Sequence, residues 1–229
     1  MAKKSRSIGN YIGAVIVGVV VVGIIAVGFF GSRSGGESAG TIPSFVDQQS
    51  LAWVYNSSAS TDSELEIWED FQCSHCATFS ANFSEMIQRL ADEGVFKLVM
   101  RQASFFDDRV PGQHSARAGN SFMCAVEHTS DPLGYHRMLL SMQGGSAGWS
   151  DDAFVNIAEL AGISGDSLSN FESCVREDRY LKWAVDSQAL FVKEKVPGTP
   201  YVKLNGVEVP QDVLAGTPAT FEQWLRDNA

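Results

Sequence analysis

Two cysteines three positions apart, Cys73 and Cys76, are the residues of this chain best suited to carry chemistry. A C-x-x-C spacing lets two thiols open and close a disulfide with each other, because about one helical turn separates them. His75 stands between them and, when protonated, adds positive charge that favours a thiolate. Since the thiolate is the attacking and leaving species in disulfide exchange, Cys73, His75 and Cys76 are the predicted catalytic residues.

Other uses of a C-x-x-C motif fit this sequence less well. A structural zinc site needs two more ligands, but the chain has no second C-x-x-C, and His114, His128 and His136 lack the usual H-x₃₋₅-H spacing. Covalent haem attachment needs a histidine directly after the second cysteine, where this chain has Ala77. A structural cysteine pair stays open as an alternative. We therefore expect no metal and no cofactor.

The residues around the motif predict a strand that runs into a helix. Residues 65–71 form an extended, largely apolar run that is typical of a buried strand. Residues with helical spacing then follow, namely Cys76, Phe79, Phe83, Met86 and Leu90. Cys73 would lie at the helix N-terminus, where unpaired backbone N–H groups and the helix dipole favour a thiolate. This arrangement is typical of thioredoxin-like redox proteins.

The N-terminal segment predicts a membrane anchor. Lys3, Lys4 and Arg6 precede an uncharged apolar run that continues for twenty residues after position 10. A helix of that length spans about 30 Å, the thickness of the hydrocarbon core of a bilayer. A signal peptide has a shorter apolar region and a small-residue cleavage site, which is missing here, so residues 11–31 are interpreted as an uncleaved transmembrane anchor in preference to a cleaved signal.

The charge distribution predicts the orientation of the chain. Basic residues before a membrane span stay in the cytoplasm, so residues 1–10 should be cytoplasmic. The protein should cross the cell membrane once, and the residues after the anchor should lie outside the cell membrane. The exported part has 14 of the 17 Lys and Arg residues against 27 Asp and Glu residues, a net charge near −13. Such a charge argues against nucleic acid as a partner.

The other two cysteines, Cys124 and Cys174, predict a structural disulfide. All four cysteines lie after the anchor, in a compartment where disulfides persist. With Cys73 and Cys76 assigned to each other, one pairing is left for the remaining two. Two separate buried cysteines are the alternative, because cysteine is among the residues most often buried.

Interruptions of the periodic pattern by Gly, Pro, Asp and Ser residues divide the exported part into four segments. Residues 32–44 are rich in Ser and Gly and predict a flexible linker. The next segments are 45–106 (the first part of an α/β domain), 107–186 (a helical insertion) and 187–229 (the second part of the domain). Strands are expected at 51–55, 65–71 and 95–103, with an Asn-Gly hairpin at 201–209. Helices are expected at 114–127, 133–142, 151–161, from 167 onward, at 179–195 and after Thr217, which is a predicted N-cap.

Three features together resemble the DsbA family of thiol–disulfide oxidoreductases, in particular its membrane-tethered members from Gram-positive cell envelopes. They are the D-F-Q-C-S-H-C segment at 70–76, the helical insertion, and the dipeptide Thr199-Pro200 before the hairpin. The resemblance covers roughly residues 44–229. It implies a thioredoxin-like α/β fold with an inserted all-helical domain, preceded here by one transmembrane helix.

The resemblance also implies a function and a second set of site residues. A DsbA-like enzyme introduces disulfides into exported cysteine-containing proteins and is re-oxidised by a membrane partner of the DsbB or VKOR type. Thr199 and Pro200 would form the substrate-binding segment, with a cis peptide bond facing the redox cysteines. We expect a monomer. A disulfide isomerase or reductase on the same fold is the alternative function.

The sequence departs from the family pattern at two positions. Ser74 stands where many members have proline, and this dipeptide between the cysteines tunes the redox potential. Ile67 stands where many members have a buried acid six residues before the first cysteine. Glu66 or Glu69 could replace that acid as the proton acceptor for Cys76, although the expectation for each is an exposed carboxylate.

Overall fold

The computed structural model describes residues 40–109, 111–144 and 147–229. The predicted cytoplasmic N-terminus (1–10), the anchor (11–31) and most of the linker (32–44) therefore lie outside the described residues. Within the described residues, every helix is too short or too polar to cross a membrane. The end of the predicted linker is described, and the backbone N–H of Thr41 donates to the carbonyl of Arg179 at 2.7 Å.

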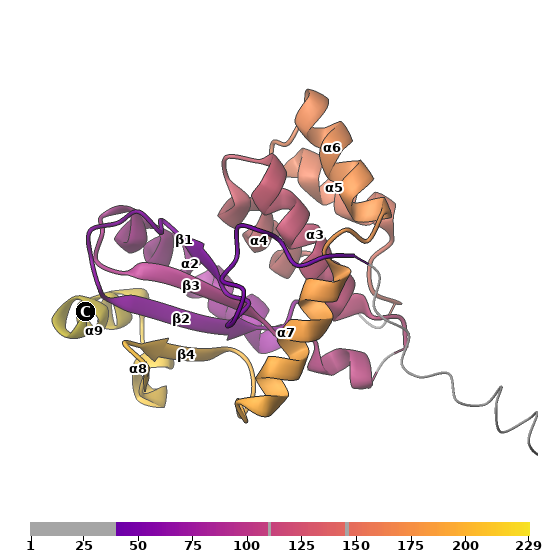
Figure 1. Cartoon of the computed structure of the whole chain (residues 1–229). Helices are drawn as coiled ribbons and strands as arrows, with labels where there is room; N and C mark the ends of the chain where they lie inside the picture. Colours follow the sequence, from indigo (N-terminus) through magenta and orange to yellow (C-terminus); the bar gives the residue numbers. More distant parts are fainter. Residues whose placement is uncertain (1–39, 110, 145–146) are drawn as a thin grey trace, which may run out of the picture. The chain divides into compact units, whose positions relative to one another are not determined.

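A five-stranded sheet in the order β1-β3-β2-β4-β5 forms the centre of the α/β part (Figure 1). The strands are β1 (Trp53–Tyr55), β2 (Glu64–Glu69), β3 (Lys97–Gln102), β4 (Tyr201–Leu204) and β5 (Val207–Glu208). The β2–β3 pair is parallel and the other pairs are antiparallel. A parallel pair needs a crossover connection, and the helix α2 (Ser74–Asp92) supplies it between β2 and β3.

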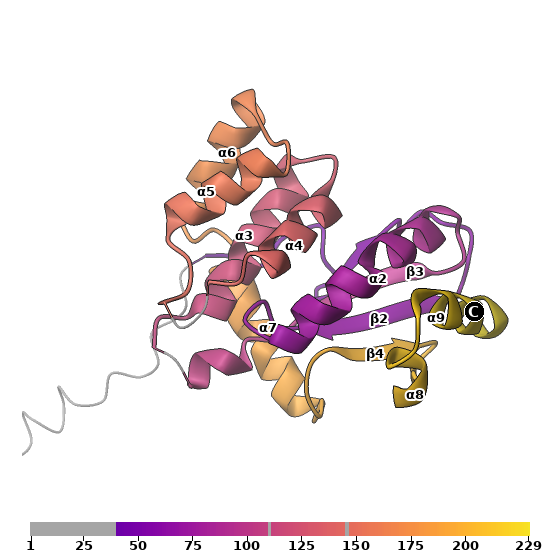
Figure 2. The ribbon, with the colours of Figure 1, turned by 180° about the vertical axis from the view of Figure 1, so that it is seen from behind.

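The central strand β2 presents a different set of side chains to each face of the sheet. Leu65 and Ile67 belong to the main core, whereas Trp68 belongs to a smaller cluster with Phe191. This alternation is expected because successive side chains of a strand point to opposite faces. Figures 1 and 2 show α2 on one face of the sheet and α7 (Leu181–Lys193) on the other.

Helix α2 buries the stripe that its periodicity predicts. Its buried side chains include Cys76, Phe79, Phe83, Met86 and Leu90. The C-terminal helix α9 (Pro218–Asn228) packs on it, with the rings of Phe83 and Phe221 5.2 Å apart. The hydroxyl of Thr217 accepts a hydrogen bond from the N–H of Thr220, so the predicted N-cap is confirmed.

The segment between β3 and β4 is helical, as predicted. It contains η1 (Phe105–Asp108), α3 (His114–His128), α4 (Pro132–Ser141), α5 (Asp151–Leu160), α6 (Gly165–Arg176) and α7. The described residues form one compact unit, so this segment is continuous with the α/β part. Helix α7 runs through the predicted boundary at 186 and packs against both α3 and β3.

The Asn-Gly hairpin is present between β4 and β5. Asn205 and Gly206 both have positive φ angles, 53° and 78°, which is the backbone that such a two-residue turn requires. The Asn205 side chain also accepts hydrogen bonds from the Ser63 hydroxyl and the Glu64 N–H. The turn is thereby tied to the start of β2. A short helix that the sequence analysis does not predict, α8 (Gln211–Leu214), follows it.

A candidate dithiol active site

The two cysteines lie where β2 turns into α2. Cys73 is the N-cap residue of α2, with extended backbone angles, and its N–H donates to the carbonyl of Asp70 at 2.9 Å. Cys73 and Cys76 are present as free thiols and are 3% and 0% exposed. The two residues between them, Ser74 and His75, are exposed. The backbone therefore turns both sulfur atoms inward and both intervening side chains outward.

The surroundings push the pKa values of the two thiols in opposite directions. A hydrogen bond from the Cys76 thiol is the main reason why the pKa of Cys73 falls to about 5. The Thr199 side chain and the backbone N–H groups of Cys76 and His75 lower the pKa further. Burial raises the pKa of Cys76 instead. At neutral pH the reduced pair is therefore a Cys73 thiolate beside a Cys76 thiol.

Thr199 and Pro200 lie next to the cysteines although they are more than 120 residues away in the sequence. Strand β4 pairs with β2, with Tyr201 opposite Trp68, so the residues before β4 meet the turn after β2. The Thr199–Pro200 peptide bond is cis, and the Thr199 carbonyl oxygen lies 3.3 Å from the Cys73 Sγ atom. The Thr199 hydroxyl is buried and lowers the pKa values of both thiols.

Glu69 is buried, which corrects the expectation that it is exposed. Glu69 is 4% exposed. It stands two residues after Ile67 on β2, so the two side chains point to the same face of the sheet, the face that α2 covers. The Glu69 carboxylate raises the pKa of Cys76. Glu66 points to the other face, is half-buried, and forms ion pairs with Arg101 and Lys203. Of the two candidate acids, Glu69 is the one that shifts the pKa of Cys76.

A second buried acid, Asp70, holds the turn before Cys73. Its carboxylate accepts hydrogen bonds from the backbone N–H groups of Gln72 and Phe106 and from the Ser115 hydroxyl. These bonds favour the charged form, but burial has the larger effect and raises the pKa of Asp70 to about 7. Asp70 has no predicted role beyond its place in the family motif.

Two further residues near the cysteines come from the helical segment and were not predicted. The Gln143 side chain, just after α4, donates hydrogen bonds to the carbonyls of Phe71 and Cys73 at 3.2 and 2.9 Å. His136, on α4, contacts Glu69. A lone glutamine and a lone histidine outside any motif carry no sequence signal for this proximity.

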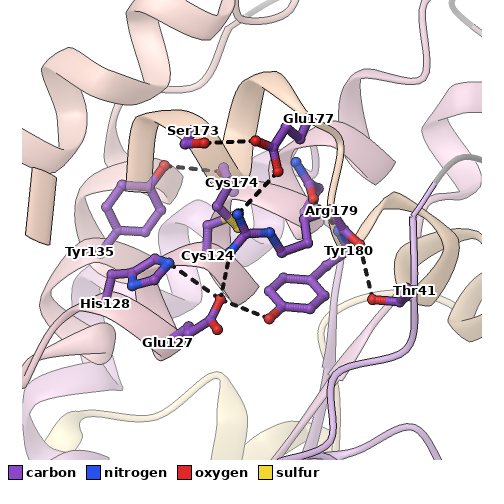
Figure 3. Close-up of a disulfide and its surroundings, with 12 residues drawn as sticks. Thr41, Cys124, Glu127, His128, Tyr135, Ser173, Cys174, Glu177, Arg179 and Tyr180 are labelled. Atoms are coloured by element: carbon purple, nitrogen blue, oxygen red, sulfur yellow. Dashed lines mark hydrogen bonds and ion pairs between the residues drawn. A yellow bond between two sulfur atoms is a disulfide. The ribbon is translucent and has the colours of Figure 1, made fainter. Parts of the chain in front are cut away.

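Cys124 and Cys174 form a disulfide that joins α3 to α6 (Figure 3). Their sulfur atoms are 2.00 Å apart and their Cα atoms 5.8 Å apart. Glu127 lies beside the disulfide and accepts a hydrogen bond from the Tyr180 hydroxyl at 2.7 Å. Glu127, His128 and Cys174 are close enough to share a metal ion, but the Cys174 sulfur is already bonded to Cys124. The disulfide thus occupies the sulfur that a metal would need.

Comparisons with known proteins agree with this geometry. A family model described as "Thioredoxin" matches residues 56–227. None of the curated proteins matches the sequence significantly. Among solved structures, the thiol–disulfide oxidoreductase MdbA from Actinomyces oris is similar with a TM-score of 0.69 and 19% identity, over 86% of this chain and 93% of that chain.

Two other solved structures share the fold. Reduced DsbA from Mycobacterium tuberculosis has a TM-score of 0.61 and 20% identity, over 84% of this chain and 92% of that chain. MdbA from Corynebacterium diphtheriae has a TM-score of 0.62 and 18% identity, over 86% of this chain and 96% of that chain. The predicted resemblance to DsbA-like proteins is confirmed in the fold, and the chain belongs to the thioredoxin family.

Proposed function

We propose that this protein is an extracytoplasmic thiol–disulfide oxidoreductase that introduces disulfides into exported proteins. The observation that carries the proposal is the pairing of a Cys73 thiol whose pKa is lowered to about 5 with a Cys76 thiol whose pKa is raised. A stabilised thiolate favours the reduced form of the enzyme, and an enzyme with a stable reduced form is a strong oxidant.

The first step is attack on the Cys73–Cys76 disulfide. A substrate thiolate forms a bond with the Cys73 Sγ atom, the bond between the two enzyme sulfurs breaks, and its electron pair moves to the Cys76 Sγ atom. A thiolate at that position is costly because burial raises the pKa of Cys76, so this sulfur takes up a proton. We assign Glu69, the acid that acts on Cys76, as the proton-exchanging group.

The second step releases the product. A second substrate thiolate attacks the substrate sulfur of the mixed disulfide, and Cys73 leaves as a thiolate. Its low pKa makes it a good leaving group. The substrate loses two electrons, and the enzyme disulfide gains them and becomes the dithiol. A membrane partner of the DsbB or VKOR type would then re-oxidise the dithiol.

Thr199 and Pro200 are assigned to substrate binding. Their backbone lies against the Cys73 sulfur, at the head of β4, where an extended substrate segment can pair with it. His75 and Ser74 are exposed beside the same sulfur and are positioned to contact the substrate.

The proposed location rests on the sequence before residue 40. The apolar run at 11–31, preceded by three basic residues, supports a location of the enzyme domain on the outer side of the cell membrane, with the N-terminus in the cytoplasm. A stable Cys124–Cys174 disulfide is compatible with that oxidising compartment.

The test is a single turnover with a reduced peptide that contains two cysteines. We expect the oxidised protein to convert the peptide to its disulfide while gaining two thiols, both measured by mass spectrometry. Given the peptide in its disulfide form, Cys76→Ser should accumulate a mixed disulfide, because the Cys73 thiolate attacks one peptide sulfur and the other leaves as a thiolate, whereas Cys73→Ser should be inactive. A wild-type protein that leaves the peptide reduced, but reduces peptide disulfides, would instead establish the reductase alternative.

A further inference from the structure

We propose that His136 passes protons between Glu69 and solvent, through a small cavity between α2 and α4, and thereby sets the rate at which Cys76 gains or loses its proton. This inference rests on the proposed disulfide exchange. It adds a positioning and relay residue from the helical segment to a site otherwise built by the α/β part of the chain.

The first observation is a buried histidine–carboxylate pair. The His136 Nε2 atom lies 2.9 Å from the Glu69 Oε2 atom, and both side chains are 5% exposed. The His136 ring packs against two aromatic rings, with centroid distances of 5.4 Å to Phe71 and 5.2 Å to Phe122. A pair this well buried, with nitrogen and oxygen atoms 2.9 Å apart, can exchange a proton directly without competition from bulk water.

The second observation is a carboxylate oxygen without a partner. The Glu69 Oε1 atom is buried and makes no hydrogen bond, whereas Oε2 is taken by His136. Buried polar atoms are nearly always hydrogen-bonded, so an orphaned oxygen requires an explanation. The same carboxylate acts electrostatically on the Cys76 thiol, so the unpaired oxygen belongs to the group that we propose exchanges the proton of Cys76.

The third observation is a route outward from the pair. Glu69 and His136 line a cavity of about 20 Å³, which is large enough for one water molecule. Ser80, Ser84 and Arg137 line this cavity and also an open groove of about 250 Å³. The groove runs between α2 and α4 on the surface. The three shared residues therefore form the boundary between the cavity at the buried pair and the solvent-filled groove.

These observations define a balanced proton transfer. When the Cys73–Cys76 disulfide opens, the electron pair arrives on the Cys76 Sγ atom, and one proton passes to it from the Glu69–His136 pair. Water in the cavity returns one proton to the pair from the groove. During re-oxidation the Cys76 proton leaves by the same atoms in the reverse order. Disulfide exchange supplies the electrons, so no additional oxidant or reductant is needed.

Charged groups on neighbouring elements set the field around His136. Glu69 faces it from β2, and Cys76 acts on Glu69 from α2. Arg137 on α4 lines the cavity that leads to the groove. Arg101 on β3 borders a second cavity of about 10 Å³ beside Glu69 and His136, but its guanidinium group pairs with Glu66 and Glu194 on the opposite face of the sheet. These groups interact, so the pH dependence of the proton transfer should reflect the titration of the whole cluster and not of His136 alone.

The experiment is a rapid-quench single turnover of the oxidised full-length chain with the two-cysteine peptide, from pH 5 to 9, in H₂O and in D₂O. We expect His136→Gln to lower the rate about 10-fold or more, to flatten the pH profile and to abolish the solvent isotope effect. Glu69→Gln should have the same effect, and the double variant should be no slower than either single variant. His128→Gln, a change elsewhere on the helical segment, should keep the wild-type rate and profile.

A second variant keeps the proposal testable if His136→Gln does not fold. Ser84→Val leaves Glu69 and His136 intact but fills the cavity that links them to the groove, and it should lower the rate and the isotope effect. Wild-type rate, pH profile and isotope effect in a folded His136→Gln, or in Ser84→Val, would overturn the relay. A wild-type chain that cannot oxidise the peptide at all would instead refute the proposed function.

Discussion

The Sγ atom of Cys73 lies 3.3 Å from the backbone carbonyl oxygen of Thr199, across a sequence separation of 126 residues. The pairing of β4 with β2 produces this contact, because it places the residue before Pro200 beside the turn that carries the first cysteine. The helical segment fills most of the intervening sequence without separating the two halves of the site. This segment in turn contributes Gln143 and His136.

Cys73 should be the reactive thiol of the reduced protein. Its pKa of about 5 leaves it ionised at neutral pH, whereas burial raises the pKa of Cys76 and keeps that thiol protonated. Alkylation with iodoacetamide, mapped by mass spectrometry, should label Cys73 with a midpoint near pH 5. The Cys76→Ser variant keeps the position but changes the main hydrogen-bond donor, so its midpoint should shift. Equal labelling of both cysteines would contradict the assignment.

The reduced protein should gain stability relative to the oxidised protein as the pH rises. The folded pKa of Cys73 is lowered from 9.0 to about 5, so its contribution is absent at pH 4, grows above pH 5 and is complete near pH 9. At pH 7 it amounts to roughly 3 kcal/mol. Above pH 9 the raised pKa of Cys76 acts in the opposite direction, because the unfolded chain would release that proton.

Urea unfolding of both redox forms between pH 4 and 9 measures this difference. The pH-dependent part of the gap is the informative quantity, because the constraint that the disulfide places on the unfolded chain does not titrate. A gap that stays constant from pH 4 to 8 would contradict the low pKa of Cys73.

Thr199→Val should raise the pKa of Cys73. Valine has nearly the same shape as threonine but lacks the buried hydroxyl that lowers the pKa of the thiol. Removing this polar group from the neighbourhood of the thiolate should raise the pKa of Cys73 by up to about one unit. Thiolate absorbance at 240 nm follows the titration. Thr78→Val, on the exposed side of α2, is the matched control and should leave the midpoint in place.

Removing the Cys124–Cys174 disulfide should lower stability and spare exchange activity. The bond closes a loop across a sequence separation of 50, which is worth roughly 4 kcal/mol in the chain-entropy model. Cys124→Ala combined with Cys174→Ala should therefore lower the free energy of unfolding by a comparable amount. Peptide oxidation at 25 °C should persist, since Cys73 and Cys76 are separate thiols. Complete loss of activity in a folded double variant would show that the disulfide has a redox role.

Local patterns explain why much of the fold could be predicted. The spacing of Phe79, Phe83 and Leu90 identifies the buried stripe of α2, and Asn205-Gly206 fixes the hairpin by its turn geometry. Strand alternation places Glu66 and Glu69 on opposite faces of the sheet but does not say which of the two is the more deeply buried. Only the packing of α2 decides that Glu69 is buried.

The parts of the site that could not be predicted depend on tertiary approach. His136 reaches Glu69, and Gln143 reaches the carbonyl of Cys73, across about seventy residues of intervening chain. Neither residue stands in a motif, and helix periodicity places them on α4 or after it without indicating which part of the sheet α4 meets. The spacing of His136 to the other histidines argues against a zinc site but carries no information about a carboxylate partner.

The reduction potential of the Cys73–Cys76 pair is the most direct test of the central claim. Equilibration of the full chain with glutathione buffers, followed by mass spectrometry of the trapped thiols, yields the potential. DsbA lies near about −120 mV and thioredoxin near about −270 mV. The low pKa of Cys73 predicts a value closer to that of DsbA, as expected of an oxidase. A value near that of thioredoxin would contradict the account and assign the protein to the reductases.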